Sequence, residues 1–530
     1  MKKQVLKRGL ALGACVMMAF SAVGCKEKVS NDENTLEMFI CDFGYGTQWL
    51  KAQAEEFQKT DWVTAKYPEL KVTVDSLADQ AMANSKIMSG EQGNTADLLF
   101  TASENGYIYF ESGNYLDLTS LYESEIPNES VKVKDKMIEK KYTERLYLTD
   151  DGEEKIYSFP WVNGFSGLFI NLTAKNEILG EDYVMPRTSQ ELAKMCEDIK
   201  ASSTNSKNAY PFISSSTYYK TMFSIWWAQY EGLNEINNYY NGIADGELSN
   251  KIFEQKGRLR ALEELEKIMG YDSKNVDPQS QELDFMSLQA HFFNGNAVMM
   301  TNGDWLETEM KELIKGEITV MKNPVISTIT EKLSVVKTEE ELAFVVQCVD
   351  EDKDFSATKT AFAENFSKEL SSTDYDKIYE ARNIMNAWNA HEAYIPSYST
   401  AKELAKDFLL FMASDKGIEI FMRETSGCQT AFTYDAEVKN PELFNSFTTL
   451  QKDHVKLGRK AIPTPDNSHT RLVAYGGLKN LTAVNLQSSF ISENSASRRT
   501  AMQVYQDDID YYSEQNGRFD IMLRQAGLKG

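Results

Sequence analysis

The stretch DLLFT at residues 97–101 is a short, continuous apolar run of the kind that lies inside a parallel sheet. Two further strand patterns precede it, TLEMFICD at 35–42 and VTVDSL at 72–77. Helical patterns fill the two intervals, at about 46–58 and about 79–90. This alternation predicts an α/β unit with right-handed crossovers, in which ligands bind at the carboxyl ends of the strands. Two of those ends carry 42–45 (DFGY) and 103–105 (SEN).

Further α/β signals follow along the chain. GLFINLTA at 167–174 is typical of another buried strand. The pattern of residues 296–310 predicts a strand, a turn and then a helix. Residues 330–390 are charged and helical without clear strand signals, which indicates an inserted subdomain. Two helices are expected at 401–413 and 415–425, followed by a mainly helical C-terminal part. No internal repeat is visible.

Length and composition exclude several classes of protein. A chain of 530 residues exceeds the size at which a single core stops growing, so more than one unit is expected. Its 42% hydrophobic residues exclude global disorder. With 79 acidic and 56 basic residues the net charge is −23, which argues against a nucleic-acid-binding protein.

The N-terminus has the pattern of an export signal. Four basic residues precede a 15-residue apolar run at 9–23, too short for a comfortable membrane span, and the run ends in AVGC with Cys25 last. A small residue next to Cys resembles a bacterial lipobox, so we expect Cys25 to carry lipid; the alternative is an ordinary signal peptide with an incidental Cys. Residues 25–34 would form a tether. Removing 1–24 removes four positive and no negative charges, which changes −23 to −27.

Signatures of metal and catalytic sites are scarce. HExxH, GxSxG, P-loop and GxGxxG patterns are all missing, and the four His residues have no ligand spacing. The remaining cysteines lie far apart without CxxC spacing; buried thiols are the favoured interpretation, and any pairing stays open. The run Asp350, Asp352, Asp354 begins like a calcium loop, but Phe355 stands where Gly is required. We therefore expect no metal and no cofactor.

Aromatic and amide residues stand out instead. A sugar offers apolar CH faces and many hydroxyls, which suit flat aromatic rings beside carboxylates and amides. Three places combine them: Trp161 with Asn163, the neighbours Trp226 and Trp227, and 302–305 (NGDW). Of Trp226 and Trp227, one is expected to face the core and the other outward.

Four longer motifs follow one another along the chain: DLLFTASENGYIYFESGNYLDLTSLYE (97–123), YSFPWVNGFSGLFIN (157–171), FFNGNAVMMTNGDW (292–305) and IPSYSTAKELAKDFLLFMASDKGIEIF (395–421). In this order they resemble the carbohydrate type (family 1) of the extracellular solute-binding proteins of ABC importers. The resemblance implies a periplasmic-binding-protein-like (type II) fold, with two α/β lobes, hinge crossovers and a ligand between them. It implies an N-terminal lobe of 35–155 plus about 296–330, a C-terminal lobe of 156–295 plus about 395–530, and a helical insertion at 331–394.

By position, the resemblance also implies a set of cleft residues. Trp161 and Trp305 would stack on sugar rings, Glu104 and Asp304 would accept hydrogen bonds from hydroxyls, and Asn105 and Asn163 would donate or accept. The full expected set is Tyr45, Glu104, Asn105, Trp161, Asn163, Trp226, Asn302, Asp304 and Trp305.

The expected function is therefore capture of a carbohydrate, for which an oligosaccharide is favoured. The protein would be a monomeric lipoprotein that delivers this ligand to ABC permease subunits. The protein would be exported and held at the outer face of the bacterial cytoplasmic membrane by lipid alone, with no nucleic-acid partner and no catalysis. Two alternatives stay open: the same fold binding a peptide, polyamine or other non-sugar solute, and a surface glycosidase, which needs only two suitably spaced carboxylates.

Overall fold

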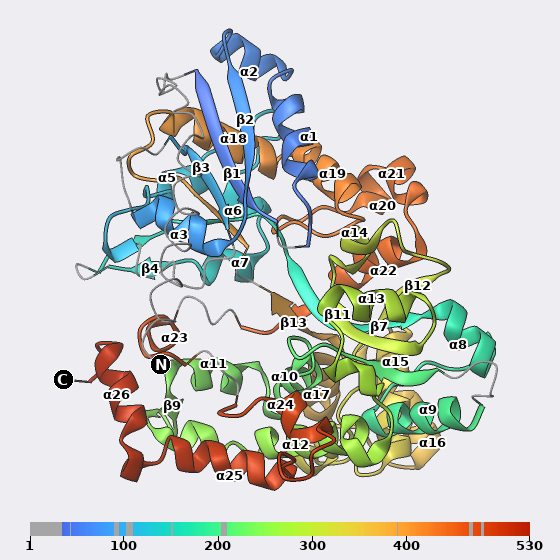
Figure 1. Ribbon diagram of the computed structural model, residues 1–530. Coiled ribbons are helices and arrows are strands. Elements are labelled where there is room, and N and C mark those ends of the chain that lie inside the picture. Colours follow the sequence, from blue (N-terminus) through green and yellow to red (C-terminus); the bar gives the residue numbers. More distant parts are fainter. Residues whose placement is uncertain are drawn as a thin grey trace, which may run out of the picture.

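The computed structural model shows a two-lobed α/β protein (Figure 1). Residues 1–33, with the expected signal, Cys25 and most of the tether, lie outside the described part, as do Glu104 and Asn105. The described residues are 34–42, 44–88, 95–101, 110–149, 152–202, 209–388, 391–465, 470–478 and 482–529.

The N-terminal lobe is built on a five-stranded sheet of order β2-β1-β3-β14-β6. Strand β1 (Thr35–Cys41) pairs in parallel with β2 (Lys71–Leu77) and β3 (Leu98–Thr101), which confirms the three expected strands. Strands β14 (Glu392–Tyr394) and β6 (Phe159–Pro160) add antiparallel pairs. The apolar residues that alternate along β1 face helices, and this burial fixes the register of the strand.

The helices that cover this sheet come from both ends of the family-like region. Helix α1 (Gln48–Phe57) matches the expected helix and contacts α18 (Lys402–Ala413) and α19 (Asp415–Glu424). Figure 1 shows these orange helices beside the blue strands of the upper lobe. Residues 402–424 therefore belong to the N-terminal lobe. Their expected place in the C-terminal lobe was wrong, because sequence order does not reveal which core a returning segment joins.

The C-terminal lobe has a six-stranded sheet centred on β7 (Gly164–Asn171). Strand β11 (Ala297–Gly303) pairs antiparallel with β7 and parallel with β8 (Tyr210–Ile213), and β12 (Ile318–Met321) also pairs with β7. The expected assignment of 296–330 to the N-terminal lobe was thus wrong. Strands β11 and β12 are buried along their whole length, which is typical of central strands but does not identify the strand with which each pairs.

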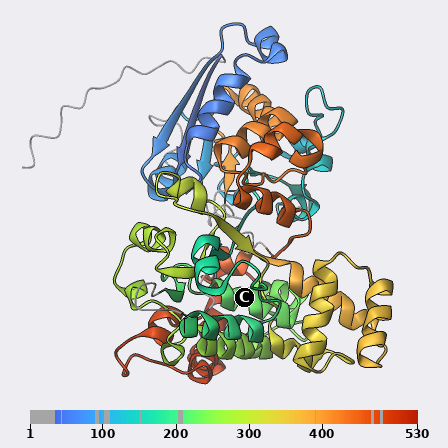
Figure 2. The ribbon, with the colours of Figure 1, turned by 90° about the vertical axis from the view of Figure 1, so that its right-hand side faces the viewer.

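The expected insertion is part of this second lobe. Helices α15 (Glu339–Asp350), α16 (Phe355–Phe366) and α17 (Ser372–Asn383) project sideways from it (Figure 2), and their inner faces join its core. Contrary to expectation, the stretch then contains strands: β13 (Ile384–Trp388) pairs with β7, and β14 joins the other sheet.

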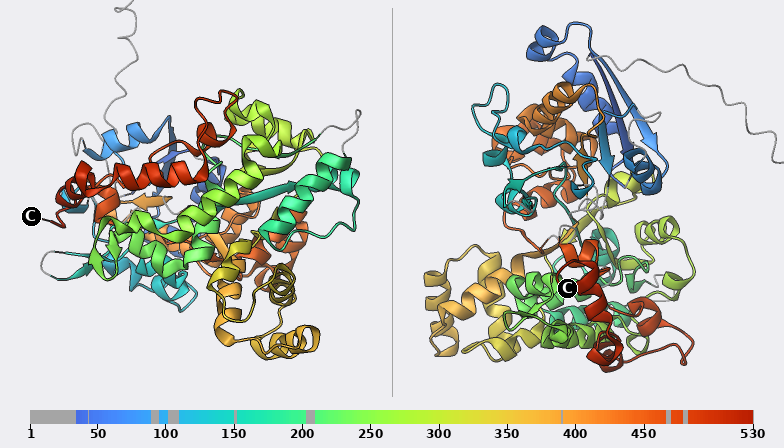
Figure 3. Two further views of the ribbon diagram at one scale, coloured as in Figure 1. Left: turned by 90° about the horizontal axis from the view of Figure 1, so that it is seen from below. Right: turned by 90° about the vertical axis from the view of Figure 1, so that its left-hand side faces the viewer.

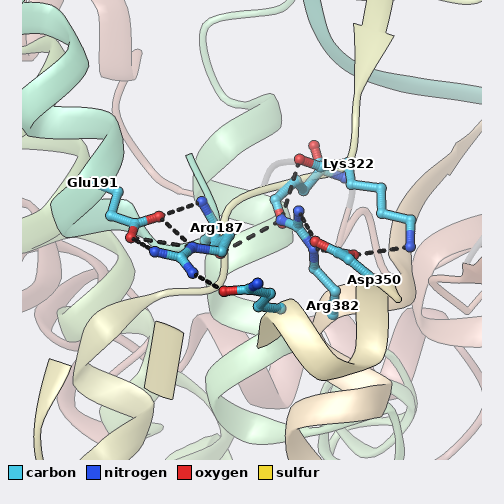
Figure 4. A network of polar contacts seen from close by, with 7 residues as sticks. Arg187, Glu191, Lys322, Asp350 and Arg382 are labelled. Atoms are coloured by element: carbon cyan, nitrogen blue, oxygen red, sulfur yellow. Dashed lines mark hydrogen bonds and ion pairs between the residues drawn. The ribbon is translucent and has the colours of Figure 1, made fainter. Parts of the chain in front are cut away.

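A network of charged groups joins the insertion to the lobe (Figure 4). Asp350 of α15 accepts from Arg382 Nη2 at 2.7 Å and from Lys322 Nζ at 3.0 Å. Arg187 donates to Gln347 at 2.8 Å and also pairs with Glu191. These partners come from four separate segments, so the network fixes α15 and α17 against the body of the lobe.

The chain passes from one lobe to the other in three connections between described elements. They are residues 161–163 between β6 and β7, the β13–β14 connection, and the junction of α21 (Pro441–Ser446) with α22 (Thr449–Gly458). The remaining C-terminal helices, including α25 (Ala501–Tyr511) and α26 (Arg518–Gln525), lie along the lower lobe (Figure 3).

Candidate ligand-binding site

A cluster of aromatic rings fills the seam where the two lobes meet. Tyr45, from the β1–α1 loop, lies with its ring centroid 5.5 Å from Trp161 and 5.5 Å from Trp305. His391 at the β13–β14 crossover lies 5.2 Å from Tyr45 and 5.1 Å from Trp161. We call Tyr45, Trp161, Trp305 and His391 the seam cluster. It brings together three of the expected site residues, from the N-terminal lobe, a crossover and the C-terminal lobe.

Two glycines allow Trp305 to reach the other lobe. A Cβ on Gly44 would lie 2.4 Å from Cδ1 of the indole, and a Cβ on Gly303 would lie 2.2 Å from its Cη2. Gly44 also has φ +93°, a conformation that L side chains rarely adopt. The indole is consequently buried, with 4% exposure, and does not offer the open stacking face that was expected of it.

One hydrogen bond inside the seam links the lobes directly. Tyr45 Oη donates to Asp304 Oδ1 at 2.7 Å, while the Asp304 backbone N–H is bound to the Phe165 carbonyl of β7 at 3.0 Å. Burial raises the pKa of Asp304 to about 7. Its second oxygen, Oδ2, has no hydrogen-bond partner in the described part of the chain. A ligand hydroxyl placed there would satisfy a buried acceptor.

Aromatic rings continue from the seam towards the surface. Tyr218 lies 5.9 Å from Trp305, and the half-buried Phe285 lies 5.6 Å from Tyr218. Glu309 of α14 (Leu306–Met310) accepts a hydrogen bond from the Gln289 side chain at 2.6 Å. Burial raises the pKa of Glu309. Rings and carboxyl groups thus run side by side, the combination that suits polyhydroxylated rings.

The expected asparagines take different positions. Asn302 is fully buried in β11, and its side chain accepts from the Gly303 backbone N–H at 2.7 Å, so it shapes the turn before Asp304. Asn163 is half-buried and lines a cavity of about 830 Å³ next to α22. Paired charges such as Lys136 with Asp415 border that cavity. Asn163 is therefore near the crossover but is not a member of the seam cluster.

Trp226 is a core residue of the C-terminal lobe. It sits in α10 (Thr221–Glu231), is fully buried, and donates from Nε1 to the Pro324 carbonyl at 3.2 Å. Trp227 is also buried, with its indole bound to Gln255 at 2.8 Å. The expectations that one of the pair faces outward and that Trp226 contacts ligand were wrong, because α10 is covered on nearly all sides and both positions lie inside.

Sequence reasoning missed four residues that shape the seam. Gly44, Tyr218 and Cys428 line it, and His391 completes the ring cluster. Cys428 Sγ–H donates to the Asp304 carbonyl at 3.4 Å. Gly44 lies within the strand-end segment 42–45, which the sequence already placed near the ligand, whereas no local sequence pattern distinguishes His391 or Cys428. All four later cysteines are buried free thiols, as expected.

Comparison with known protein families identifies the family of the chain. A model of the family of bacterial extracellular solute-binding proteins matches residues 44–419. The chain belongs to this family. Comparison with curated protein sequences gives no match. Members of this family bind solutes outside the cell.

Solved structures share this two-lobed fold at low sequence identity. A maltose-bound MalE3 of T. maritima superposes with a TM-score of 0.55 at 15% identity, over 90% of this chain and 98% of that one. The Listeria monocytogenes substrate-binding protein Lmo0181, in complex with cycloalternan, gives 0.55 at 14%, over 92% and 100%. A structure from work on xylan utilization by Caldanaerobius polysaccharolyticus gives 0.53 at 15%, over 93% and 100%.

Two features are absent from the described residues. No His, Cys, Asp and Glu side chains gather there in a group of three that could hold a metal ion. No helix in those ranges has the length and apolar character that a membrane crossing requires.

Proposed function

We propose that this solute-binding protein captures a carbohydrate between its lobes and delivers it to an ABC importer. The observation that carries the proposal is the seam cluster with Asp304: rings from both lobes surround a buried carboxyl group that has one unused oxygen. Aromatic faces and carboxylate acceptors at one interface form the recognition chemistry of sugars.

Binding at the seam requires the lobes to separate. Trp305 and Tyr45 are buried against each other's lobe, and the Tyr45–Asp304 hydrogen bond must be exchanged for bonds to the ligand. The ligand then shifts a hinge equilibrium by contacts that exist only when it lies between the lobes. No covalent chemistry is needed, and Tyr45, Asp304 and Trp305 would supply the contacts.

The solved relatives support a carbohydrate over other solutes. Two of them have maltose and cycloalternan as their bound molecules. One feature favours a different ligand: Asp304 and Glu309 place two carboxyl groups beside aromatic rings, which would also suit a polyamine through hydrogen bonds and cation–π contact. A polyamine is therefore the second candidate.

A thermal-shift screen tests the proposal. The protein is heated with a panel of mono- and oligosaccharides, and in parallel with polyamines and short peptides. Stabilisation by a sugar, followed by calorimetric titration, is the expected result, because a ligand that binds only the folded state raises its melting temperature. Stabilisation by polyamines alone would overturn the sugar assignment, and release of shorter products from oligosaccharides would indicate a glycosidase.

The anchoring part of the proposal concerns Cys25. A lipid on this residue would hold the exported protein at the membrane surface near its permease. Growth with a labelled fatty acid should label the native chain and leave Cys25→Ser unlabelled. Equal labelling of both chains, or label in neither, would contradict the lipoprotein assignment.

A further inference from the structure

Helix α23 (Arg471–Ala474) is fixed in the C-terminal lobe. Leu472 and Val473 belong to the core of that lobe together with Phe519 of α26. The helix packs close to the end of α11 (Leu233–Asn241), where a Cβ on Gly242 would lie 3.0 Å from Leu472 Cδ2. Its position therefore follows the C-terminal lobe as a body.

Glu111 is fixed in the N-terminal lobe. The preceding Phe110 is buried in an aromatic wall, stacked on Tyr157 at 5.1 Å and edge-on to Tyr147 at 6.0 Å. Tyr147 Oη donates to Glu111 Oε1 at 3.1 Å. The carboxylate is thus held in place by rings that pack on the sheet of its own lobe.

These two fixed points touch across the lobes. Arg471 Nη2 lies 2.8 Å from Glu111 Oε1, and Tyr475 Oη donates to Glu111 Oε2 at 2.5 Å. The partners are 360 and 364 residues apart in sequence. In Figure 1, helices α23 and α14 lie on opposite sides of β13. Helix α14 directly follows Trp305 in the sequence. The contact is therefore separate from the seam cluster.

We propose that Arg471 and Tyr475 form a clasp on Glu111 that holds the two lobes together in the absence of ligand. The clasp is supplied by a segment beyond residue 419, where the family model ends. It spans the lobes at a place where no described chain crossover runs, and it adds an energetic term to the hinge equilibrium that the crossovers themselves do not contain.

The size of the effect follows from the exposure of the groups. The Arg471 and Glu111 side chains are 34% and 36% exposed, so the ion pair is weak and screened by salt, and the Tyr475 hydrogen bond adds to it. We expect removal of the clasp to raise the population with separated lobes by about tenfold, which corresponds to about 1.4 kcal/mol.

Hydrogen–deuterium exchange of the ligand-free protein tests the clasp. The quantity measured is exchange at the seam, in peptides covering 44–50 and 301–307. These peptides should exchange about tenfold faster in Glu111→Ala and in the double variant Tyr475→Phe with Arg471→Gln. The increase should come from the loop amides at 44–47 and 305–306, which lie outside strand β11 and helix α1 and become accessible when the lobes part. The charge-exchanged pair E111R/R471E should recover part of the protection. High salt should speed seam exchange in the native protein and not in the variants.

A matched control comes from the same part of the chain. Asp520 and Lys529 form an exposed ion pair at 2.9 Å within the C-terminal lobe, so Asp520→Asn should leave seam exchange unchanged. Unchanged seam exchange in correctly folded Glu111→Ala, and in the correctly folded double variant Tyr475→Phe with Arg471→Gln, would overturn the proposal. Since no ligand is present, this outcome is independent of whether the protein binds sugar.

Discussion

His454 is a buried histidine that does not tolerate charge. It lies in α22, edge-on to Phe165 at 5.4 Å and to Phe169 at 6.2 Å, and neither ring nitrogen has a hydrogen-bond partner among the described residues. Burial lowers its pKa to about 3. Because the unfolded chain binds the proton near pH 6.5, the stability contributed by neutral His454 is present above that pH and is lost as the pH falls.

We predict that acid weakens the native protein through this residue. Between pH 7 and pH 5, unfolding free energy should fall by about 2 kcal/mol more in the native protein than in His454→Phe, which removes the titrating group. Denaturant titrations at the two pH values measure the difference. His291 is half-buried in the same lobe, so His291→Phe is the control and should retain the native acid sensitivity. Equal acid sensitivity in native protein and His454→Phe would contradict the prediction.

Gly44 and Gly46 provide a matched pair for testing the seam. Both have positive φ, +93° and +69°, but a Cβ on Gly46 meets nothing within 4 Å, whereas one on Gly44 would strike Trp305. Gly46→Ala should lower unfolding free energy by roughly 1–2 kcal/mol through backbone strain alone. Gly44→Ala should lower it further and shift tryptophan emission to the red, since the indole must leave its place. Identical behaviour of the two variants would show that Trp305 does not lie against Gly44.

At the residue scale, the sequence identified part of the seam. Tyr45, Asp304 and Trp305 were expected by position from the family resemblance, and Tyr45 also lies at the end of an expected strand, where ligands of α/β sheets bind. Trp226 was misplaced because hydrophobic periodicity cannot separate an all-round buried helix from one with an exposed aromatic face. The closed contact of Trp305 with Gly44 also lay beyond prediction, since it depends on how two lobes dock.

Among the elements, α25 is held by a buried charge pair. Arg258 of α12 (Lys256–Met269) donates from Nη2 to Asp508 Oδ2 at 2.7 Å, and neither side chain is exposed. The guanidinium also lies 5.1 Å from the Trp227 ring and 5.0 Å from the Tyr239 ring. This pair attaches a C-terminal helix, outside the matched family region, to the core of the lobe.

We predict that Asp508→Ala is strongly destabilising. It removes the carboxylate that Arg258 Nη2 contacts inside the core, which should lower unfolding free energy by about 3–5 kcal/mol. The control lies on α12, the helix of Arg258. Arg260 and Glu263 form a partly exposed ion pair there at 2.8 Å, so Glu263→Gln should change the unfolding free energy by less than about 0.5 kcal/mol. Denaturant midpoints compare the two. A loss in Asp508→Ala no larger than in the control would show that the pair does not anchor α25.

Local elements were more predictable than their partners. The strands at 35–42, 72–77 and 97–101 and the helices at 401–413 and 415–425 were recognised from period and composition. The pairing of β11 with β7 and the return of α18 and α19 to the first lobe were not, because a strand or helix with a fully apolar face packs equally well on either core. Long-range docking decides such cases.

At the scale of the whole molecule, three features stand out among the described contacts that join the lobes. The crossovers carry the chain, the seam cluster buries rings from both sides, and Glu111 meets Arg471 and Tyr475 on the other side of β13. Ligand entry must break the last two and leave the first intact. The lobes therefore start from a closed arrangement whose stability sets the apparent affinity for any solute.

The central claim is that the seam is where the solute binds, and calorimetric titration of Trp305→Ala tests it most directly. The titrant is the carbohydrate that most stabilises the native protein, with Trp226→Phe as the control for a buried tryptophan outside the seam. The account predicts a dissociation constant at least about tenfold weaker for Trp305→Ala, equivalent to about 1.4 kcal/mol, and native affinity for Trp226→Phe. Native affinity in a folded Trp305→Ala would contradict it.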